Sequence, residues 1–461
     1  MSTLRKRLSL LALMAALLAL PGCGVSLEGA SDGGNAGPVE QGASNPASAE
    51  SASLPQRPVG VIRIDGKAQG SLTDSLIEEY GGDAADASFD VESSDEAAAF
   101  EAFCRGEADI VDSARPISPA EYAACSANGI EPVQIQVASD AAVLAIENET
   151  DVGVDCLSVP DVREIFRAAS PVTNWSQVGY GDRPAVGPNA LPIKVAGPDA
   201  RSNVFGFFGS AVLGDPDPSP VLLRGDYEAF PSDRGVRLAV AGSAGERARA
   251  EQRGESERVL RDLEAVLDDA TRAVAIAEFQ VEKGIEDGRT ETTRIADTER
   301  LEDAEAKLGE LSEELELAEA RARLDEVAAE RVAERYGTLG LFRFSFYELW
   351  EERLRPMEIE VSGEGGPECI FPSQSTVTDA SYPLSRQLLL TVDLATMREA
   401  EINDFLSFAV ANSDRVAIAH ALVPLPEEVR NTELAWLGGE SPPDVVYYPP
   451  SQVEEDSGAS G

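Results

Sequence analysis

The sequence predicts an α/β protein with a mostly parallel sheet, into which an antiparallel hairpin of two long helices is inserted. Short β-rich runs alternate with segments of helical periodicity from residue 59 to about residue 241, which is typical of α/β layers. Between about residues 242 and 335 the composition then changes abruptly to Glu, Arg, Ala and Leu, as in long helices. With 461 residues the chain is long enough for two or three domains.

The alternation begins with a strand at 59–65 and a helix at 71–80, in which Leu72, Leu76 and Tyr80 have helical spacing. Further strands are expected at 87–92, 108–113, 132–138, 141–148 and 191–197, and further helices at 94–105, 119–127, 159–168 and 202–213. Sheets of this class bind ligands outside the carboxyl ends of their strands. Candidate binding loops are therefore 65–71, 92–97, 112–116 and 197–204.

The inserted segment carries two apolar seams with alternating steps of three and four residues. The seams are Leu260, Leu263, Leu267, Ala270, Val274, Ala277 and Val281, then Leu301, Ala304, Leu308, Leu311, Leu315, Ala318 and Ala322. Gly284 and Gly288 lie between them, so we predict an antiparallel coiled-coil hairpin that turns there. Arms of about 40 residues would be roughly 60 Å long. The hairpin is either a solvated spacer or an arm that docks a protein partner.

The charge balance and the residue types present argue against several classes of partner and of chemistry. Asp and Glu number 82 against 38 Lys and Arg, a net charge of -44, which argues against nucleic acid and anionic membrane surfaces as partners. His420 is the only histidine, and no Cys-x-x-Cys pair occurs. The chain thus offers neither a nucleophile–base pair nor a metal-ligand set. We expect no enzymatic activity, no metal and no cofactor.

The N-terminus reads as an export signal. Arg5, Lys6 and Arg7 precede an apolar run at 8–20 that is too short to span a bilayer of about 30 Å. Leu20-Pro21-Gly22-Cys23 resembles a lipobox, so residues 1–22 are predicted to be removed and Cys23 to be lipidated, with ordinary secretion as the alternative. Residues 23–57 have a linker composition and would tether the folded body to the membrane of the cell envelope.

Four further cysteines, Cys104, Cys125, Cys156 and Cys369, would lie in an oxidising compartment after export. Four cysteines allow three pairings, and four free thiols are the alternative. Cys104 and Cys125 flank one short segment, which favours a bond between them. Cys156 and Cys369 would then join distant parts of the chain.

Several motifs occur in a fixed order along the chain. They include Phe103-Cys104-Arg105-Gly106-Glu107-Ala108-Asp109-Ile110, Ser113-Ala114-Arg115-Pro116-Ile117, Val172-Thr173-Asn174-Trp175-Ser176 and Tyr382-Pro383-Leu384-Ser385-Arg386. This ordered set resembles the Pst-type phosphate-binding proteins of bacterial ABC importers, particularly their cysteine-containing branch. The resemblance covers about residues 62–240 and 336–425. The hairpin interrupts the family pattern inside its second half.

The resemblance implies a two-lobed fold of the periplasmic-binding-protein type (type II-like) that closes on an oxyanion. Lobe 1 is expected at 58–145 and 375–425, and lobe 2 at 146–241 and 336–374. The hairpin occupies 242–335, and an acidic, Pro-rich tail is expected at 426–461.

The resemblance also implies ligand residues in three loops, and each loop departs from the family pattern. The first offers Lys67 and Gln69, the second Ser93 and Ser94, and the third Ser202 and Asn203, while Arg115 is retained as a guanidinium suited to an oxyanion.

Each of these residues has a structural alternative. Asp95 and Glu96 place carboxylates in the second loop, where they disfavour an anion unless they serve only to cap the next helix. Arg115 could instead pair with Asp95 or Glu96 as an internal latch. Ser202 could be only an N-cap, and Lys67 and Gln69 only loop surface.

The expected function is therefore uptake of phosphate or a related oxyanion together with an ABC permease, by a lipid-anchored protein outside the cytoplasm. The alternative is a cell-surface scaffold or sensor derived from this fold, which interacts through its hairpin.

Overall fold

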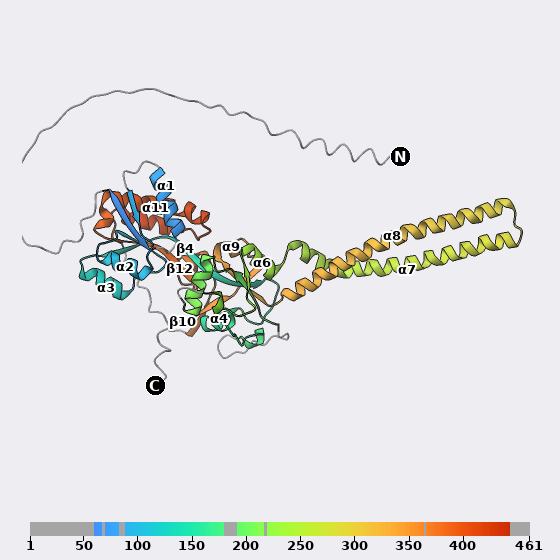
Figure 1. Ribbon diagram of the computed structural model, residues 1–461, viewed down its shortest axis with the longest axis horizontal. Coiled ribbons are helices and arrows are strands. Elements are labelled where there is room, and N and C mark those ends of the chain that lie inside the picture. The colour runs from blue at the N-terminus through green and yellow to red at the C-terminus, as the bar shows by residue number, and fades with distance from the viewer. Residues whose placement is uncertain are drawn as a thin grey trace, which may run out of the picture. The chain divides into compact units, whose positions relative to one another are not determined.

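A mixed sheet of nine strands runs through the protein in the order β2-β1-β3-β12-β4-β8-β6-β7, with β9 paired to β4 (Figure 1). The computed structural model describes residues 60–66, 70–82, 88–178, 191–215, 219–363 and 366–442. The strands are β1 (Val61–Gly66), β2 (Ser88–Val91), β3 (Ile110–Ser113), β4 (Pro132–Glu147), β6 (Lys194–Pro198), β7 (Glu228–Phe230), β8 (Thr338–Arg343), β9 (Leu354–Pro356) and β12 (Ser385–Asp393). A second sheet contains β11 (Gly366–Ile370), β10 (Glu358–Gly363) and β5 (Cys156–Ser158).

The sheet is less parallel than the sequence predicts. Strands β1, β2 and β3 pair in parallel, as do β6, β7 and β8. Between these two groups, β12 is antiparallel to both β3 and β4, and β4 is antiparallel to β8. The alternation of strands and helices therefore identifies the two parallel groups but not the strands that join them.

β4 corrects a second expectation, because the strands predicted at 132–138 and 141–148 form one strand of 16 residues. Ser139 and Asp140 interrupt the apolar pattern, which suggests a break. Both are instead buried within the sheet. Asp140 forms an ion pair with Arg386 of the neighbouring strand β12, and the backbone of Ser139 bonds to the backbone of Val423. Polar residues with such partners can stay inside a continuous strand.

Several helices of the two lobes begin directly after a residue whose side chain caps them. Asp95 accepts a bond from the backbone N–H of Ala98 at the start of α2, and Ser118 forms a capping box with Glu121 at the start of α3. The helices of the lobes are α1 (Gly70–Gly82), α2 (Glu96–Cys104), α3 (Pro119–Ala127), α4 (Val159–Phe166), α5 (Asn203–Phe208), α6 (Asp233–Ala241), α9 (Phe344–Glu348), α10 (Gln374–Thr378), α11 (Ala400–Ala419) and α12 (Glu427–Leu437). Short 3-10 helices are η1 (Trp175–Gln177), η3 (Pro220–Leu222) and η4 (Thr396–Arg398), and η2 (Gly209–Leu213) is a π-helix that follows α5.

Two main cores divide the body, and their boundary differs from the predicted one. Val133, Ile135 and Ala138 of β4 belong to the first core, whereas the strand from Ala141 onward belongs to the second. Tyr382 and Leu384 also pack into the second core, although the sequence assigns them to lobe 1. In β4 the change of core falls at Ser139 and Asp140, the polar interruption between Ala138 and Ala141, whereas Leu388, Leu390 and Val392 of β12 all belong to the first core. The polar pair that suggests a break between two strands therefore marks the boundary between the cores.

The C-terminal segment corrects a further expectation. Part of the predicted tail at 426–461 forms α12, whose Leu437 is buried in the first core beside α11. Glu433 of the same helix is buried against β4, where it accepts a bond from the backbone N–H of Gln136 at 3.2 Å. The acidic composition that suggests a tail includes a residue that the fold buries.

The helical hairpin is confirmed. α7 (Ala244–Glu286) and α8 (Glu291–Arg335) run side by side in Figure 1 and contact each other extensively. Gly288 has a φ of 65° in the turn between them, a conformation that glycine adopts without strain. Every residue of the two predicted seams is buried or half-buried. The seams therefore identify the faces on which the helices meet.

Candidate functional site

The first-lobe loops lie at the carboxyl ends of the parallel strands β1 and β3 and converge on carboxylates of the protein itself. Asp65, the penultimate residue of β1, is buried and accepts bonds from the backbone N–H groups of Gly66 at 2.7 Å and Ser94 at 3.0 Å. Gly66 has a φ of 113°, and a Cβ there would lie 2.2 Å from the carbonyl oxygen of Asp112. This loop consequently requires glycine where it approaches β3.

The two acidic residues of the second loop have different roles. Asp95 caps α2 through Ala98, at 3.1 Å. Glu96 instead turns back to the loop after β3, where Oε1 accepts the backbone N–H of Ala114 at 2.5 Å and Oε2 lies 3.3 Å from Nε of Arg115. The capping alternative holds for Asp95, and the latch alternative holds for Glu96.

Arg115 is held on two sides by carboxylates. Its Nη1 and Nη2 donate to the two carboxylate oxygens of Glu121 at 2.9 and 2.7 Å, in addition to the contact with Glu96. The guanidinium carbon lies 4.9 Å from the ring centroid of Phe100, and the side chain is 18% exposed. Burial by itself would raise the pKa of Glu121, but bonds from Arg115 and Ser118 outweigh it and lower that pKa. Glu121 thus stays ionised opposite the guanidinium.

The hydrogen-bond donors in these loops are of the kind that binds oxyanions. Backbone N–H groups and a guanidinium fork, the donors that bind oxyanions in proteins, here bind carboxylate oxygens of Asp65, Glu96 and Glu121. An external oxyanion would have to displace these carboxylates or share their donors.

Of the other ligand residues predicted for the first lobe, the structure describes the two serines but not Lys67 and Gln69. Ser93 is exposed between β2 and α2, and Ser94 is half-buried beside it. Lys67 and Gln69 lie outside the described residues, as does Cys23. The structure therefore bonds Ser94 to Asp65 and Arg115 to Glu96 and Glu121 in the same lobe, while residues 67–69 of the first loop lie outside the described ranges.

In the second lobe, Ser202 and Asn203 follow β6, at the carboxyl end of the parallel strands β6 and β8. Ser202 is the N-cap residue of α5, but its hydroxyl makes no capping bond, which argues against a role in capping alone. The neighbouring Arg201 and Asp199 form an ion pair at 2.5 Å, and Arg201 lowers the pKa of Asp199 mainly by hydrogen bonding. Ser202 and Asn203 thus occupy the matching edge of the second lobe.

A buried ion pair that the sequence analysis did not single out joins the neighbouring antiparallel strands β4 and β12. Arg386 of β12 donates to Asp140 of β4 at 2.8 Å, and its guanidinium lies 4.7 Å from the ring of Phe207 on α5. Two signals could have found it: Asp140 is a charge inside a long apolar run, and Arg386 belongs to the family-like motif. Asp65 gives a similar signal at the end of β1.

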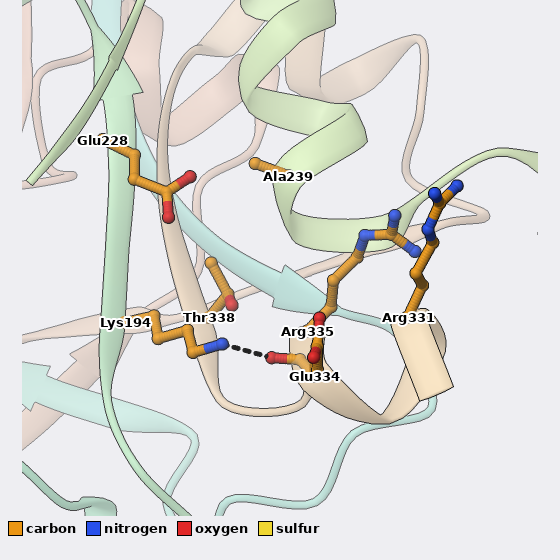
Figure 2. Close-up of a pocket in the computed structure, with 7 residues that line it drawn as sticks. All are labelled: Lys194, Glu228, Ala239, Arg331, Glu334, Arg335 and Thr338. Carbon is orange, nitrogen blue, oxygen red and sulfur yellow. Dashed lines mark hydrogen bonds between the residues drawn. The ribbon is translucent and has the colours of Figure 1, made fainter. Parts of the chain in front are cut away.

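The opposite edge of the second-lobe strands carries a cavity of about 180 Å³ at the root of the hairpin (Figure 2). Lys194, Glu228 and Thr338, the first residues of β6, β7 and β8, line it together with the last turn of α8. Lys194 donates to the carbonyl oxygen of Glu334 at 2.7 Å, and Arg335 pairs with Glu246 at 3.1 Å. The first bond ties the hairpin to β6, and the second joins the two hairpin helices at their root.

Both expected disulfides are present. Cys104 bonds Cys125 and joins α2 to α3, and Cys156 bonds Cys369 and joins β5 to β11. The second bond links residues 213 positions apart.

Within the described ranges, no three His, Cys, Asp or Glu residues are grouped so that they could hold a metal ion. The same ranges contain no helix with the length and apolarity needed to cross a membrane.

Two α/β cores joined by crossing strands, with donors for anionic oxygens at the strand ends, define a two-lobed binding protein. The profile of the PBP superfamily domain matches residues 46–413, so the chain belongs to that superfamily. This confirms the predicted fold class.

Individual relatives agree with this family. Protein SphX of Synechocystis sp. is 24% identical over 365 residues, which cover 78% of this chain and 76% of that protein. Phosphate-binding protein PstS of Staphylococcus haemolyticus is 28% identical over 97 residues, or 21% of this chain and 30% of that protein. The crystal structure of a possible phosphate binding protein from Planctomyces limnophilus has 20% identity and a TM-score of 0.52, and the match covers 82% of this chain and 98% of that one. The likeness to that structure shows the fold.

Proposed function

We propose that this protein binds phosphate or a related oxyanion outside the cytoplasm and delivers it to an ABC permease. The observation that carries the proposal is the donor set at the first-lobe strand ends, where N–H groups of Gly66, Ser94 and Ala114 and the guanidinium of Arg115 already bind carboxylate oxygens. The named function of the PstS relative supports phosphate as the first anion to test.

The ligand set that we propose comprises Lys67, Gln69, Ser93, Ser94, Arg115, Ser202 and Asn203. Arg115 is its main contributor, because a guanidinium adds a full positive charge to the hydrogen bonds. Glu96 opposes binding, since its carboxylate engages two of the donors and repels an approaching anion.

Isothermal titration of the folded body with phosphate, sulfate and arsenate tests the proposal. Arg115→Ala should weaken phosphate binding at least tenfold, because a charge-assisted hydrogen bond contributes about 1.5 to 3 kcal/mol. Glu96→Gln should tighten it, because the amide oxygen can still accept from Ala114 while the negative charge is removed. Arg105→Ala is the matched control, since Arg105 is an exposed arginine of the same lobe that pairs with Glu101 and Glu107.

A second candidate function is a cell-surface scaffold or sensor that interacts through the hairpin. The specific observation in its favour is that Glu96 and Glu121 together hold Arg115, so the donors are satisfied without a ligand. If the wild-type protein binds none of these anions and Glu96→Gln gains no binding, the scaffold function replaces the uptake function.

We further propose that the protein reaches the cell envelope as a lipoprotein. Its residues 1–22 would act as a signal peptide, Cys23 would carry the lipid, and residues 23–57 would be the tether. The lipobox-like sequence before Cys23 supports this proposal. Mass spectrometry of the mature N-terminus checks it: Cys23→Ser should abolish acylation and release the protein from the membrane fraction, whereas an unmodified N-terminus in the wild type would contradict it.

A further inference from the structure

The outer face of α8 carries an apolar stripe that no described element covers. Leu317, Ala320, Leu324 and Val327 follow steps of three, four and three residues, the spacing of a helix-packing seam. Leu317 is 73% exposed, Leu324 56% and Val327 43%, and Ala320 is also exposed. Single exposed apolar residues are common, but a set at this spacing forms one continuous surface.

The stripe is separate from the seam that holds the hairpin together. On α8 the inner seam includes Leu311, Leu315 and Ala318, which are buried or half-buried against α7. At 3.6 residues per turn, the stripe lies about 130° to 170° round the helix from the centre of that seam. α8 consequently has two apolar faces, of which α7 covers one.

The charges around the stripe indicate the chemistry of a partner. Exposed acidic residues on and beside it are Glu313, Glu314, Glu316, Glu326 and Glu330. Three exposed arginines also lie on or beside it, and each is paired with a neighbouring side chain: Arg321 with Gln252 of α7 at 3.1 Å, Arg323 with Glu319 at 3.3 Å and Arg331 with Glu246 of α7 at 3.7 Å. The rim of the stripe is therefore mainly negative, as is the whole chain at a net charge of -44. A second copy would bring like charges together, which disfavours self-association through this face.

We propose that the outer face of α8 at residues 317–327 docks an amphipathic helix of a partner protein, with Leu or Ile at heptad spacing and Lys or Arg on its flanks. The partner helix would bury the stripe as the third member of a helical bundle, and its basic flanks would face the glutamates. This docking goes beyond anion uptake and gives the second candidate function a defined surface. It does not depend on the anion loops, so a failed phosphate titration leaves it intact.

The test uses the full chain and two synthetic helical peptides with the same Leu and Ile heptads, one flanked by Lys and Arg and one by Glu. Fluorescence anisotropy at physiological salt should show binding of the basic peptide only. Leu317→Lys with Leu324→Lys should weaken that binding at least tenfold, because it removes the apolar contacts and repels the basic flanks. Lysine is a good helix former, so circular dichroism should show unchanged helix content.

Ile276→Lys is the matched control, because Ile276 is 59% exposed on α7 and lies outside the stripe. This variant should bind the basic peptide as the wild type does. The proposal is overturned if the basic peptide fails to bind the wild type, or if all three proteins bind it equally, which would indicate attraction to the acidic chain alone. It is also overturned if sedimentation shows that the stripe mediates a dimer of this chain that Leu317→Lys with Leu324→Lys abolishes.

Discussion

The two lobes and the helical hairpin solve the problem of burying apolar surface in different ways. In the lobes, sheet and helices form layers, and residues such as Phe405, Ile135 and Phe342 are completely enclosed. In the hairpin, all of whose residues are described, only Ala277, Leu311 and Ala328 among the apolar side chains are buried. Two helices share a single interface, so most of each circumference remains in water. The lobes can therefore hold the side chains of a binding site in fixed positions, whereas the hairpin exposes a long helical surface to solvent.

Two buried acidic residues, one in the hairpin and one in the lobes, have different surroundings. In the hairpin, Asp325 accepts from Ser256 at 2.6 Å and lies 3.5 Å from Arg249. In the lobes, Glu433 accepts from the backbone N–H of Gln136, and burial raises its pKa to about 8. Asp325 is paired by an arginine that remains at the surface, and in the lobes Asp140 is paired by Arg386, whereas at Glu433 burial outweighs the bond from the backbone of Gln136.

The largest expected effect comes from the disulfide that joins distant parts of the second lobe. Replacing Cys156 and Cys369 by alanine should cost about 5 kcal/mol in the chain-entropy model, because the bond closes a loop spanning 213 positions. Replacing Cys104 and Cys125 should cost about 3 kcal/mol, because they are 21 positions apart. Urea unfolding of both variants measures the difference. Equal losses would show that loop length does not govern the contribution.

Core truncation should separate the two regions next. Phe405→Ala in the first core should destabilise the protein by about 3 to 5 kcal/mol, because its surroundings are enclosed on all sides. Leu311→Ala in the hairpin should cost about 2 kcal/mol, near the lower limit for such changes, because the exposed helices can close around the gap. Denaturant midpoints compare the two. A larger loss for Leu311→Ala would contradict the proposed difference in packing.

Glu433 should make the stability of the body depend on pH. Its pKa of about 8 in the folded protein lies above the ordinary value of 4.5. The folded state therefore keeps a proton that the unfolded state loses, and the free energy of unfolding should fall as pH rises from about 5 to 8, by up to about 1.4 kcal/mol per pH unit.

Glu433→Gln should remove this dependence and be more stable than the wild type near pH 8, while the two should converge near pH 4. Thermal unfolding across this range measures both proteins. Parallel pH profiles would show that Glu433 titrates normally.

The smallest effect is expected from removing the hairpin. Nη2 of Arg335, at the end of α8, lies 3.1 Å from Oε1 of Glu246, near the start of α7. The two ends of the hairpin are therefore neighbours, and a short Gly-Ser link can replace residues 244–335. The remaining lobes should keep a cooperative transition within a few degrees of the full chain, because their cores contain none of the removed side chains. Calorimetry provides the measurement, and loss of cooperativity would make the hairpin part of the core.

Much of the fold follows from local patterns. The seams of the hairpin, the glycine in its turn and the caps at Asp95 and Ser118 are predictable, because helix packing and capping depend on residues three or four positions apart. The proximity of Cys104 and Cys125 along the chain likewise favours their pairing. The sequence could not decide whether Glu96 caps a helix or binds Arg115, since both uses suit the same position.

Only the tertiary structure decided the contacts that define the candidate site. Arg115 is six positions from Glu121 and 19 from Glu96, yet both carboxylates hold it, and Arg386 meets Asp140 across 246 positions. Glu433 is one of many acidic residues near the C-terminus until α12 buries it against Gln136. Such pairings depend on the register of strands and on the packing of helices against the sheet, which are set by the balance of many distant contacts. Local sequence therefore determined many of the elements, though not the continuity of β4 or the presence of α12, and long-range packing determined which charges meet.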